Sequence, residues 1–193
     1  MEKMKVRELM RSIDEFPRIS DQATLMEAVE ALEKADYEFK SGKTPERILL
    51  VNDVTGSIVG KLSPMDVVQG LEPNYDSIDS LKSSQYYHLI RFSLQSMKEQ
   101  YRLWSKPLGK LCESAHNVKI QDFIKMPTFD HMVKADDKMD AAFHLFVVRR
   151  HGSLFVKDGH YIVGLILFSD VYKKIKETMR TCNLPAQARR ANV

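Results

Sequence analysis

The sequence predicts an α+β (α/β-like) fold in which two copies of one β-α-β-β-α unit follow each other along the chain. The main observation is a phrase that occurs twice, because Ile58–Leu71 aligns without gaps with Ile162–Ile175 and five positions are identical. A weaker repeat precedes it, since Val6–Val29 matches Ile120–Phe143 at apolar positions. Repetition at this scale indicates two copies of one supersecondary unit that cannot bury their apolar faces alone. Any ligand site is therefore expected between the copies.

The first half of each copy is an extended stretch followed by a helix. In copy one a short segment around Val6–Met10 leads to an extended stretch near Arg18–Ser20. Thr24-Leu-Met-Glu27 has the pattern of a capping box, which predicts a helix that begins there and continues to about Lys34.

The second half of each copy is a hairpin followed by a helix. The apolar run Ile48–Val51 and the segment Ser57–Leu62 flank turn residues, which predicts a β-hairpin. Asp66–Leu71 then starts a second helix. The offset between the copies falls from 114 to 104 along the repeat, so copy one carries about ten extra residues, for which Asp36–Pro45 is the natural place. Apolar strands with this spacing predict a sheet covered on one face by helices.

Length and composition are those of an ordinary globular protein. The chain has 193 residues, 44% hydrophobic and 28% charged, with a net charge of +3 that does not by itself imply nucleic acid. No apolar run approaches the ~20 residues that span a bilayer, and a signal-peptide core is absent. The only cysteines, Cys112 and Cys182, lie far apart without CxxC spacing. This pattern disfavours disulfides and suits a cytoplasmic protein.

The segment between the copies is expected to carry structure of its own. The repeats span residues 6–72 and 119–180, with a helical insert at 73–118 and a basic, flexible tail at 181–193. The insert contains apolar residues at helical spacing, which predicts an amphipathic helix that packs on its own domain or on a sister chain. The stripe comprises Tyr86, Ile90, Leu94, Met97, Tyr101 and Trp104, widened by Ile78, Leu81, Leu89 and Phe92.

The doubled phrase resembles the CBS domain, the module named after cystathionine β-synthase. A glycine, two apolar residues and Ser/Thr-x-x-Asp before a helix, placed after a hairpin and present twice, resemble a tandem CBS pair, or Bateman module. The resemblance covers about two thirds of the chain and leaves out the insert. It implies two repeats packed about a pseudo-twofold axis, a regulatory role without enzyme activity, dimerisation, and clefts that hold AMP, ADP or ATP.

The resemblance also implies which residues contact the nucleotide. In the family the aspartate of Ser/Thr-x-x-Asp accepts hydrogen bonds from ribose hydroxyls. Copy one keeps the pattern as Ser63 and Asp66, whereas copy two has Leu167 at the hydroxyl position, with Ser169 directly before Asp170. An ionised carboxylate is an acceptor only, so one aspartate can accept hydrogen bonds from both hydroxyls of a ribose. Capping alone is an equally physical explanation of Ser-x-x-Asp at a helix start.

Other parts of the predicted site are basic and apolar. Arg47 in copy one, and Arg149, Arg150 and His151 in copy two, are candidates for phosphate contacts, although solvated charges and helix C-terminal cations fit the same residues. The candidates for an apolar slot that accepts the adenine ring are Ile19, Ile48, Val133 and Leu154.

These observations favour a stand-alone cytoplasmic sensor that binds an adenine nucleotide and signals to a protein partner. One alternative is a scaffold in which the same frame and the inserted helix serve dimerisation without a nucleotide. Another is nucleic-acid binding through the basic tail, although a solvated tail is the preferred interpretation. The histidines lack the close spacing of a metal site, and no nucleophile motif occurs, so neither a metal nor catalysis is predicted.

Overall fold

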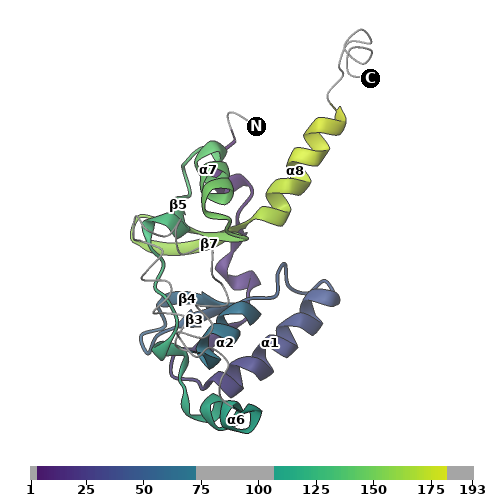
Figure 1. Cartoon of the computed structure of the whole chain (residues 1–193). Helices are drawn as coiled ribbons and strands as arrows, with labels where there is room; N and C mark the ends of the chain where they lie inside the picture. Colours follow the sequence, from purple (N-terminus) through teal and green to yellow (C-terminus); the bar gives the residue numbers. More distant parts are fainter. Residues whose placement is uncertain (1–3, 73–106, 182–193) are drawn as a thin grey trace, which may run out of the picture. The chain divides into compact units, whose positions relative to one another are not determined.

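The computed structural model of the chain describes residues 4–72 and 107–181 and has a mixed α and β fold (Figure 1). Within these residues it contains two sheets and five α-helices, which confirms the predicted fold class. The chain forms two compact units. We call residues 14–72 and 107–126 the first-repeat unit, and residues 4–13 and 127–181 the second-repeat unit.

The first-repeat unit has the predicted β-α-β-β-α order. Its sheet has the strand order β2-β3-β4, with β2 parallel to β3 and β3 antiparallel to β4. The β3–β4 hairpin agrees closely with the predicted one. The elements are β2 (Arg18–Ser20), α1 (Leu25–Lys40), β3 (Leu49–Asn52), β4 (Ile58–Leu62), α2 (Pro64–Leu71), α6 (Leu108–Asn117) and the 3-10 turn η3 (Ile120–Asp122).

The second-repeat unit repeats this order and adds one strand. Its sheet has the order β1-β7-β6-β5, in which β5 is parallel to β6 and the other pairs are antiparallel. The 3-10 turn η2 (Ile13–Glu15) spans the boundary between the units. The other elements are η1 (Val6–Glu8), β1 (Arg11–Ser12), η4 (Phe129–His131), β5 (Met132–Lys134), α7 (Met139–Arg149), β6 (Ser153–Asp158), β7 (Tyr161–Leu167) and α8 (Phe168–Thr181).

The two repeats exchange their leading segments. The Val6 amide donates a hydrogen bond to the Asp137 carbonyl at 2.9 Å, and the Ile120 amide donates to the Ala23 carbonyl at 2.9 Å. Ile120 lies 114 residues after Val6, and Ala23 lies 114 residues before Asp137. The positions that the ungapped alignment matches are therefore equivalent in the two units. Residues 4–13 therefore complete the second-repeat unit and residues 118–126 the first. Each compact unit thus combines most of one repeat with the leading segment of the other.

In each unit the glycine of the repeated phrase lies in the sheet against the leading segment that comes from the other repeat. A Cβ atom on Gly60 would lie 2.7 Å from Cγ1 of Ile124, and one on Gly164 would collide with the carbonyl oxygen of Arg11. Ile124 and Arg11 both belong to the exchanged segments. Glycine therefore allows the close approach at both positions, against a backbone oxygen at Gly164 and against a side chain at Gly60.

Helix α1 is longer than predicted. It continues to Lys40 rather than ending near Lys34 and has 16 residues, whereas its counterpart α7 has 11. Ala35 is buried and Asp36 forms an ion pair with Lys40, so packing and charge continue beyond the predicted end. Gly42, at φ 74°, follows the helix. The extra residues of copy one are thus divided between the helix and the loop after it.

The described part of the insert is helix α6, which packs on α1 and α2. It buries Leu111 and Ala115, and Val118, which follows it, accepts a hydrogen bond from the Leu25 amide at the start of α1. The predicted apolar stripe from Ile78 to Trp104 lies outside the described residues, as do residues 182–193 of the predicted tail.

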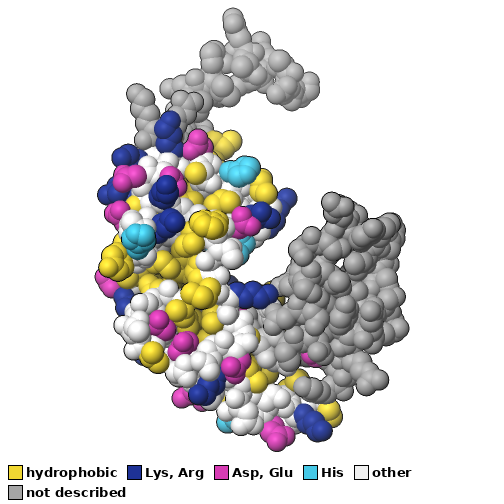
Figure 2. Space-filling model, turned by 90° about the vertical axis from the view of Figure 1, so that its left-hand side faces the viewer, with side chains coloured by type: hydrophobic (Ala, Val, Ile, Leu, Met, Phe, Trp, Pro, Cys, Tyr) yellow, Lys and Arg dark blue, Asp and Glu magenta, His cyan; other side chains and the backbone are white. Residues whose placement is uncertain are grey.

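Each unit has a hydrophobic core between its sheet and its helices. Hydrophobic side chains also reach the surface among charged ones, as one face of the molecule shows (Figure 2). Within the two described stretches, every helix is too short or too polar to cross a membrane. The core of the first-repeat unit is built on Leu25, Ala28, Leu32, Leu49, Val51, Leu62 and Ile120, and that of the second on Val6, Val133, Met139, Ala142, Leu154, Val156 and Ile166.

Candidate functional site

The junction between β4 and α2 is a capped helix start. Ser63 has an extended backbone, and both its amide and its hydroxyl donate hydrogen bonds to Oδ2 of Asp66, at 2.7 and 2.6 Å. Both side chains are half-buried. Pro64 occupies the first helical position, where its missing N–H costs nothing. The cap does not use Oδ1 of Asp66, so the carboxylate keeps acceptor capacity while its orientation is fixed.

The equivalent junction between β7 and α8 is closed by an arginine. Asp170 accepts hydrogen bonds from Nε of Arg11 at 2.8 Å and from Nη2 of Arg11 at 3.1 Å. Leu167, at the hydroxyl position, is fully buried, and the Phe168 amide donates to the Gly152 carbonyl. The two aspartates thus occupy equivalent positions in different states, one capping its own helix and the other held by β1.

Three other predicted residues lie in the first-repeat unit. Arg47 turns toward α1, where its Nη1 is 3.5 Å from Oδ1 of Asp36 and its guanidinium lies 5.6 Å from the centre of the Phe39 ring. Ile48 is buried directly before β3, and Ile19 is half-buried in β2. All three belong to the same unit as Ser63 and Asp66, and their contacts with a ligand remain predictions.

The other predicted residues lie in the second-repeat unit with Asp170. Ser169 is exposed in the first turn of α8, and Arg150 is exposed in a left-handed conformation (φ 57°) after α7. Val133 and Leu154 belong to the core of this unit. His151 is half-buried, and its ring centre lies 4.2 Å from that of His131. Their roles in ligand binding likewise remain predictions.

Three residues next to the predicted ones did not stand out in the sequence. Arg11 reaches Asp170 from 159 positions away, and His131 contacts His151 across the start of β5. Lys61 is half-buried in β4, two residues before Ser63. Burial lowers the pKa of Lys61 to about 8, although the charge of Asp66 opposes this shift. The sequence feature that could have identified Lys61 is a lysine at a position of the repeated phrase where copy two has Leu165.

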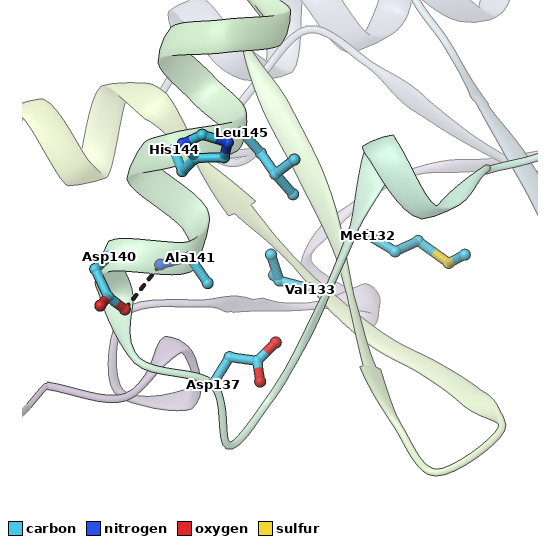
Figure 3. A pocket seen from close by; sticks show the side chains of 7 residues that line it. All are labelled: Met132, Val133, Asp137, Asp140, Ala141, His144 and Leu145. Atoms are coloured by element: carbon cyan, nitrogen blue, oxygen red, sulfur yellow. Dashed lines mark hydrogen bonds between the residues drawn. The ribbon is translucent and has the colours of Figure 1, made fainter.

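A shallow cavity of about 480 Å³ lies between β5 and α7. Val133 and Leu145 extend toward each other across it, and Asp140 and Asp137 lie near the start of α7 (Figure 3). Asp137 accepts a hydrogen bond from the Lys134 amide and Asp140 from the Ala141 amide, so both carboxylates serve the local backbone. Val133 is the only predicted site residue on its wall. Among residues 4–72 and 107–181, no cluster of side chains suits a metal ion.

The chain resembles solved structures of CBS-domain proteins over most of its length. A CBS domain-containing protein of unknown function from Bacillus anthracis is 14% identical, with a TM-score of 0.58 over 91% of this chain and 95% of that chain. The CBS domain of the bacterial CNNM/CorC family Mg2+ transporter, in complex with ATP, is 16% identical, with a TM-score of 0.55 over 91% and 89%. CBSX2 in complex with AMP is also 16% identical, with a TM-score of 0.54 over 91% and 98%.

These similarities concern the fold. No family model and no curated protein matches the chain. The fold is nevertheless that of CBS-domain proteins, as the doubled glycine–aspartate phrase predicts.

Proposed function

We propose that this chain, which has the fold of the CBS-domain proteins, is a regulatory module that binds an adenine nucleotide at the Ser63–Asp66 junction. It acts in the cytoplasm without catalysing a reaction, and it conveys occupancy of the site to a protein partner. The nucleotide complexes of two proteins with this fold, one with AMP and one with ATP, support the choice of ligand class. A ligand can shift the equilibrium between two conformations of such a module only by as much as its affinities for the two conformations differ.

The state of Asp66 carries this proposal. Its carboxylate is half-buried and fixed by two hydrogen bonds to Oδ2, and Oδ1 remains for a donor from outside the cap. A fixed acceptor in a partly dry site suits the hydroxyl groups of a ribose, because charge-assisted hydrogen bonds contribute about 1.5–3 kcal/mol each. Ile19 and Ile48 are the apolar side chains of the same unit that we assign to the adenine ring.

One site per chain is expected. Arg11 already donates two hydrogen bonds to Asp170, so a ribose would have to displace a guanidinium there. We therefore assign nucleotide binding to the first-repeat unit and a structural role to the Arg11–Asp170 pair. Calorimetric titration of the wild-type chain with AMP, ADP and ATP is expected to give a stoichiometry of one for the nucleotide that binds.

The test of the site compares two variants that lose the same kind of cap. Asp66→Ala removes the carboxylate from the cap of α2, and Glu27→Ala removes it from the cap of α1, where Glu27 accepts hydrogen bonds from the Thr24 amide and hydroxyl. We expect Asp66→Ala to weaken nucleotide binding at least tenfold and Glu27→Ala to leave it unchanged. Equal binding by wild type and Asp66→Ala removes Asp66 from the site, and absence of binding by wild type refutes the proposed function.

Dimerisation is a second candidate function that one observation favours. Helix α8 leaves Phe168, Tyr172 and Met179 exposed at helical spacing, at 43%, 57% and 71%. Exposed apolar side chains on one helix face are a common feature of interfaces between chains. Sedimentation of wild type and Tyr172→Glu tests this, since a dimer held by α8 dissociates in the variant, and a concentration-independent wild-type monomer excludes it.

A further inference from the structure

Lys61 occupies a strand position where the other repeat has a buried leucine. Its counterpart 104 residues later is Leu165, which is fully buried in β7. Lys61 pairs with Leu50 across the β3–β4 hairpin, as Leu165 pairs with Phe155 across β6 and β7. Leu50 and Phe155 are both buried. The first repeat thus has a cation at a sheet position where the second repeat has an apolar side chain and where the paired residue is apolar in both repeats.

The position of Lys61 separates it from the helix-covered core. Leu49, Val51 and Leu62 belong to the core cluster of the first-repeat unit. Because side chains alternate along a strand, Leu50 and Lys61 lie on the opposite face of the sheet. Leu165 is fully buried at this position whereas Lys61 is only half-buried, so the first repeat offers a charged donor where the second has a leucine.

Lys61 lies at the same strand–helix junction as the Ser63–Asp66 cap, because it is two residues before Ser63 and the backbone of Ser63 continues the extended conformation of β4. The Asp66 carboxylate attracts the Lys61 ammonium strongly enough to offset part of the effect of burial on the pKa of the lysine. One strand–helix junction therefore presents an acceptor and a cation together. The second-repeat unit has no equivalent arrangement, because Leu165 replaces the lysine and Arg11 binds Asp170 directly.

We infer that Lys61 is a ligand-binding residue. Its ammonium contacts the phosphate of the same molecule whose ribose hydroxyls donate hydrogen bonds to Asp66. The inference rests on the proposed function and narrows it, because it requires the ligand to carry both hydroxyl donors and an anionic group. A nucleoside 5′-phosphate has both, whereas a nucleoside has only the first. The site therefore selects nucleotides over nucleosides through Lys61, a residue outside the Ser-x-x-Asp pattern.

The experiment separates the phosphate contact from the rest of the site. AMP and adenosine are titrated by calorimetry into the wild-type chain, Lys61→Met and the control Lys157→Met. Lys157 is also half-buried in a strand, but it lies in the second-repeat unit, 5.9 Å from the centre of the Phe129 ring. Lys61→Met has an apolar side chain like that of Leu165, and a thermal melt no lower than that of wild type shows that it folds.

We expect Lys61→Met to weaken AMP binding at least tenfold and adenosine binding less than twofold, with Lys157→Met like wild type for both. If wild type binds AMP and Lys61→Met binds it equally well, Lys61 does not contact the phosphate and the nucleotide site itself survives. Equal losses for AMP and adenosine also overturn the inference, because they assign Lys61 a general effect on the site. If wild type binds neither compound, the proposed function fails first.

Discussion

Arg11 and Asp170 are joined by two hydrogen bonds, from Nε to Oδ2 at 2.8 Å and from Nη2 to Oδ1 at 3.1 Å. The pair ties β1, at the edge of the second-repeat sheet, to the first turn of α8. It therefore fixes the exchanged N-terminal segment to the unit that it completes. The paired geometry is the one in which an arginine binds a carboxylate most strongly.

This pair is predicted to stabilise the fold. The Asp170 side chain is 19% exposed and that of Arg11 41%, so solvent screens the interaction in part and its coupling energy is expected to be about 1 kcal/mol. Urea unfolding of wild type, Arg11→Met, Asp170→Asn and the double variant measures this coupling. If the effects of the two single changes simply add, the pair contributes nothing beyond its separate residues.

The two repeated glycines are predicted to differ in their tolerance of alanine. A methyl group at Gly164 meets the backbone of Arg11, which cannot move without disturbing β1, so Gly164→Ala is expected to cost about 2–4 kcal/mol. At Gly60 it meets the Ile124 side chain, which can adjust, and a cost of about 1–2 kcal/mol is expected.

Gly152 provides the matched control for both substitutions. A Cβ atom there has no heavy atom within 4 Å, so Gly152→Ala is expected to change stability by less than about 0.5 kcal/mol. All three variants are compared by urea unfolding at one pH. A loss at Gly60 equal to or larger than that at Gly164 would contradict the role assigned to the Arg11 backbone.

Local sequence signals predict the elements of this fold well. Turn residues between two apolar runs predicted the hairpin that is observed as β3 and β4, and Thr24 and Glu27 form the predicted capping box. These features depend on residues close together in the chain. The internal repeat then supplied the order of elements in the second copy, where Lys138 in place of Thr24 hides the start of α7.

Long-range relations were beyond the sequence. The apolar segment around Val6 carries no sign of which sheet it will join, because its hydrophobic pattern fits either unit equally well. The exchange of segments therefore went unpredicted, and with it the Arg11–Asp170 pair. Lys61 was overlooked for a different reason, since a lysine between Gly60 and Leu62 in an expected strand has the pattern of a solvent-facing position.

The Glu27 cap is predicted to make the stability of the fold depend on pH in the acid range. Hydrogen bonds from the Thr24 amide and hydroxyl hold the pKa of Glu27 below its usual value of 4.5. A carboxyl group with a lower pKa in the folded state stabilises the fold above the unfolded pKa, and this stabilisation is lost as the pH falls through the folded pKa. Glu27→Gln is therefore expected to be less stable than wild type at pH 7 and to approach it below pH 4.5. Urea unfolding from pH 3 to 7 checks this, and a difference that does not vary with pH would show that the charge of Glu27 is irrelevant.

Lys61 is predicted to make the stability depend on pH in the alkaline range. Burial lowers its pKa from 10.5 to about 8, so between these values the unfolded chain keeps a proton that the folded chain has lost. Stability rises with pH wherever the unfolded state binds more protons. Below pH 8 the folded chain carries the half-buried ammonium at a net cost that the charge of Asp66 offsets only in part, so Lys61→Met is expected to be the more stable protein at pH 7. Its advantage should shrink steadily as the pH is raised from 8 to 10, because wild type then sheds the charge on folding. Unfolding in urea at pH 7, 8, 9 and 10 measures the gap between the two proteins, and a constant gap would mean that the Lys61 ammonium is not desolvated in the folded chain.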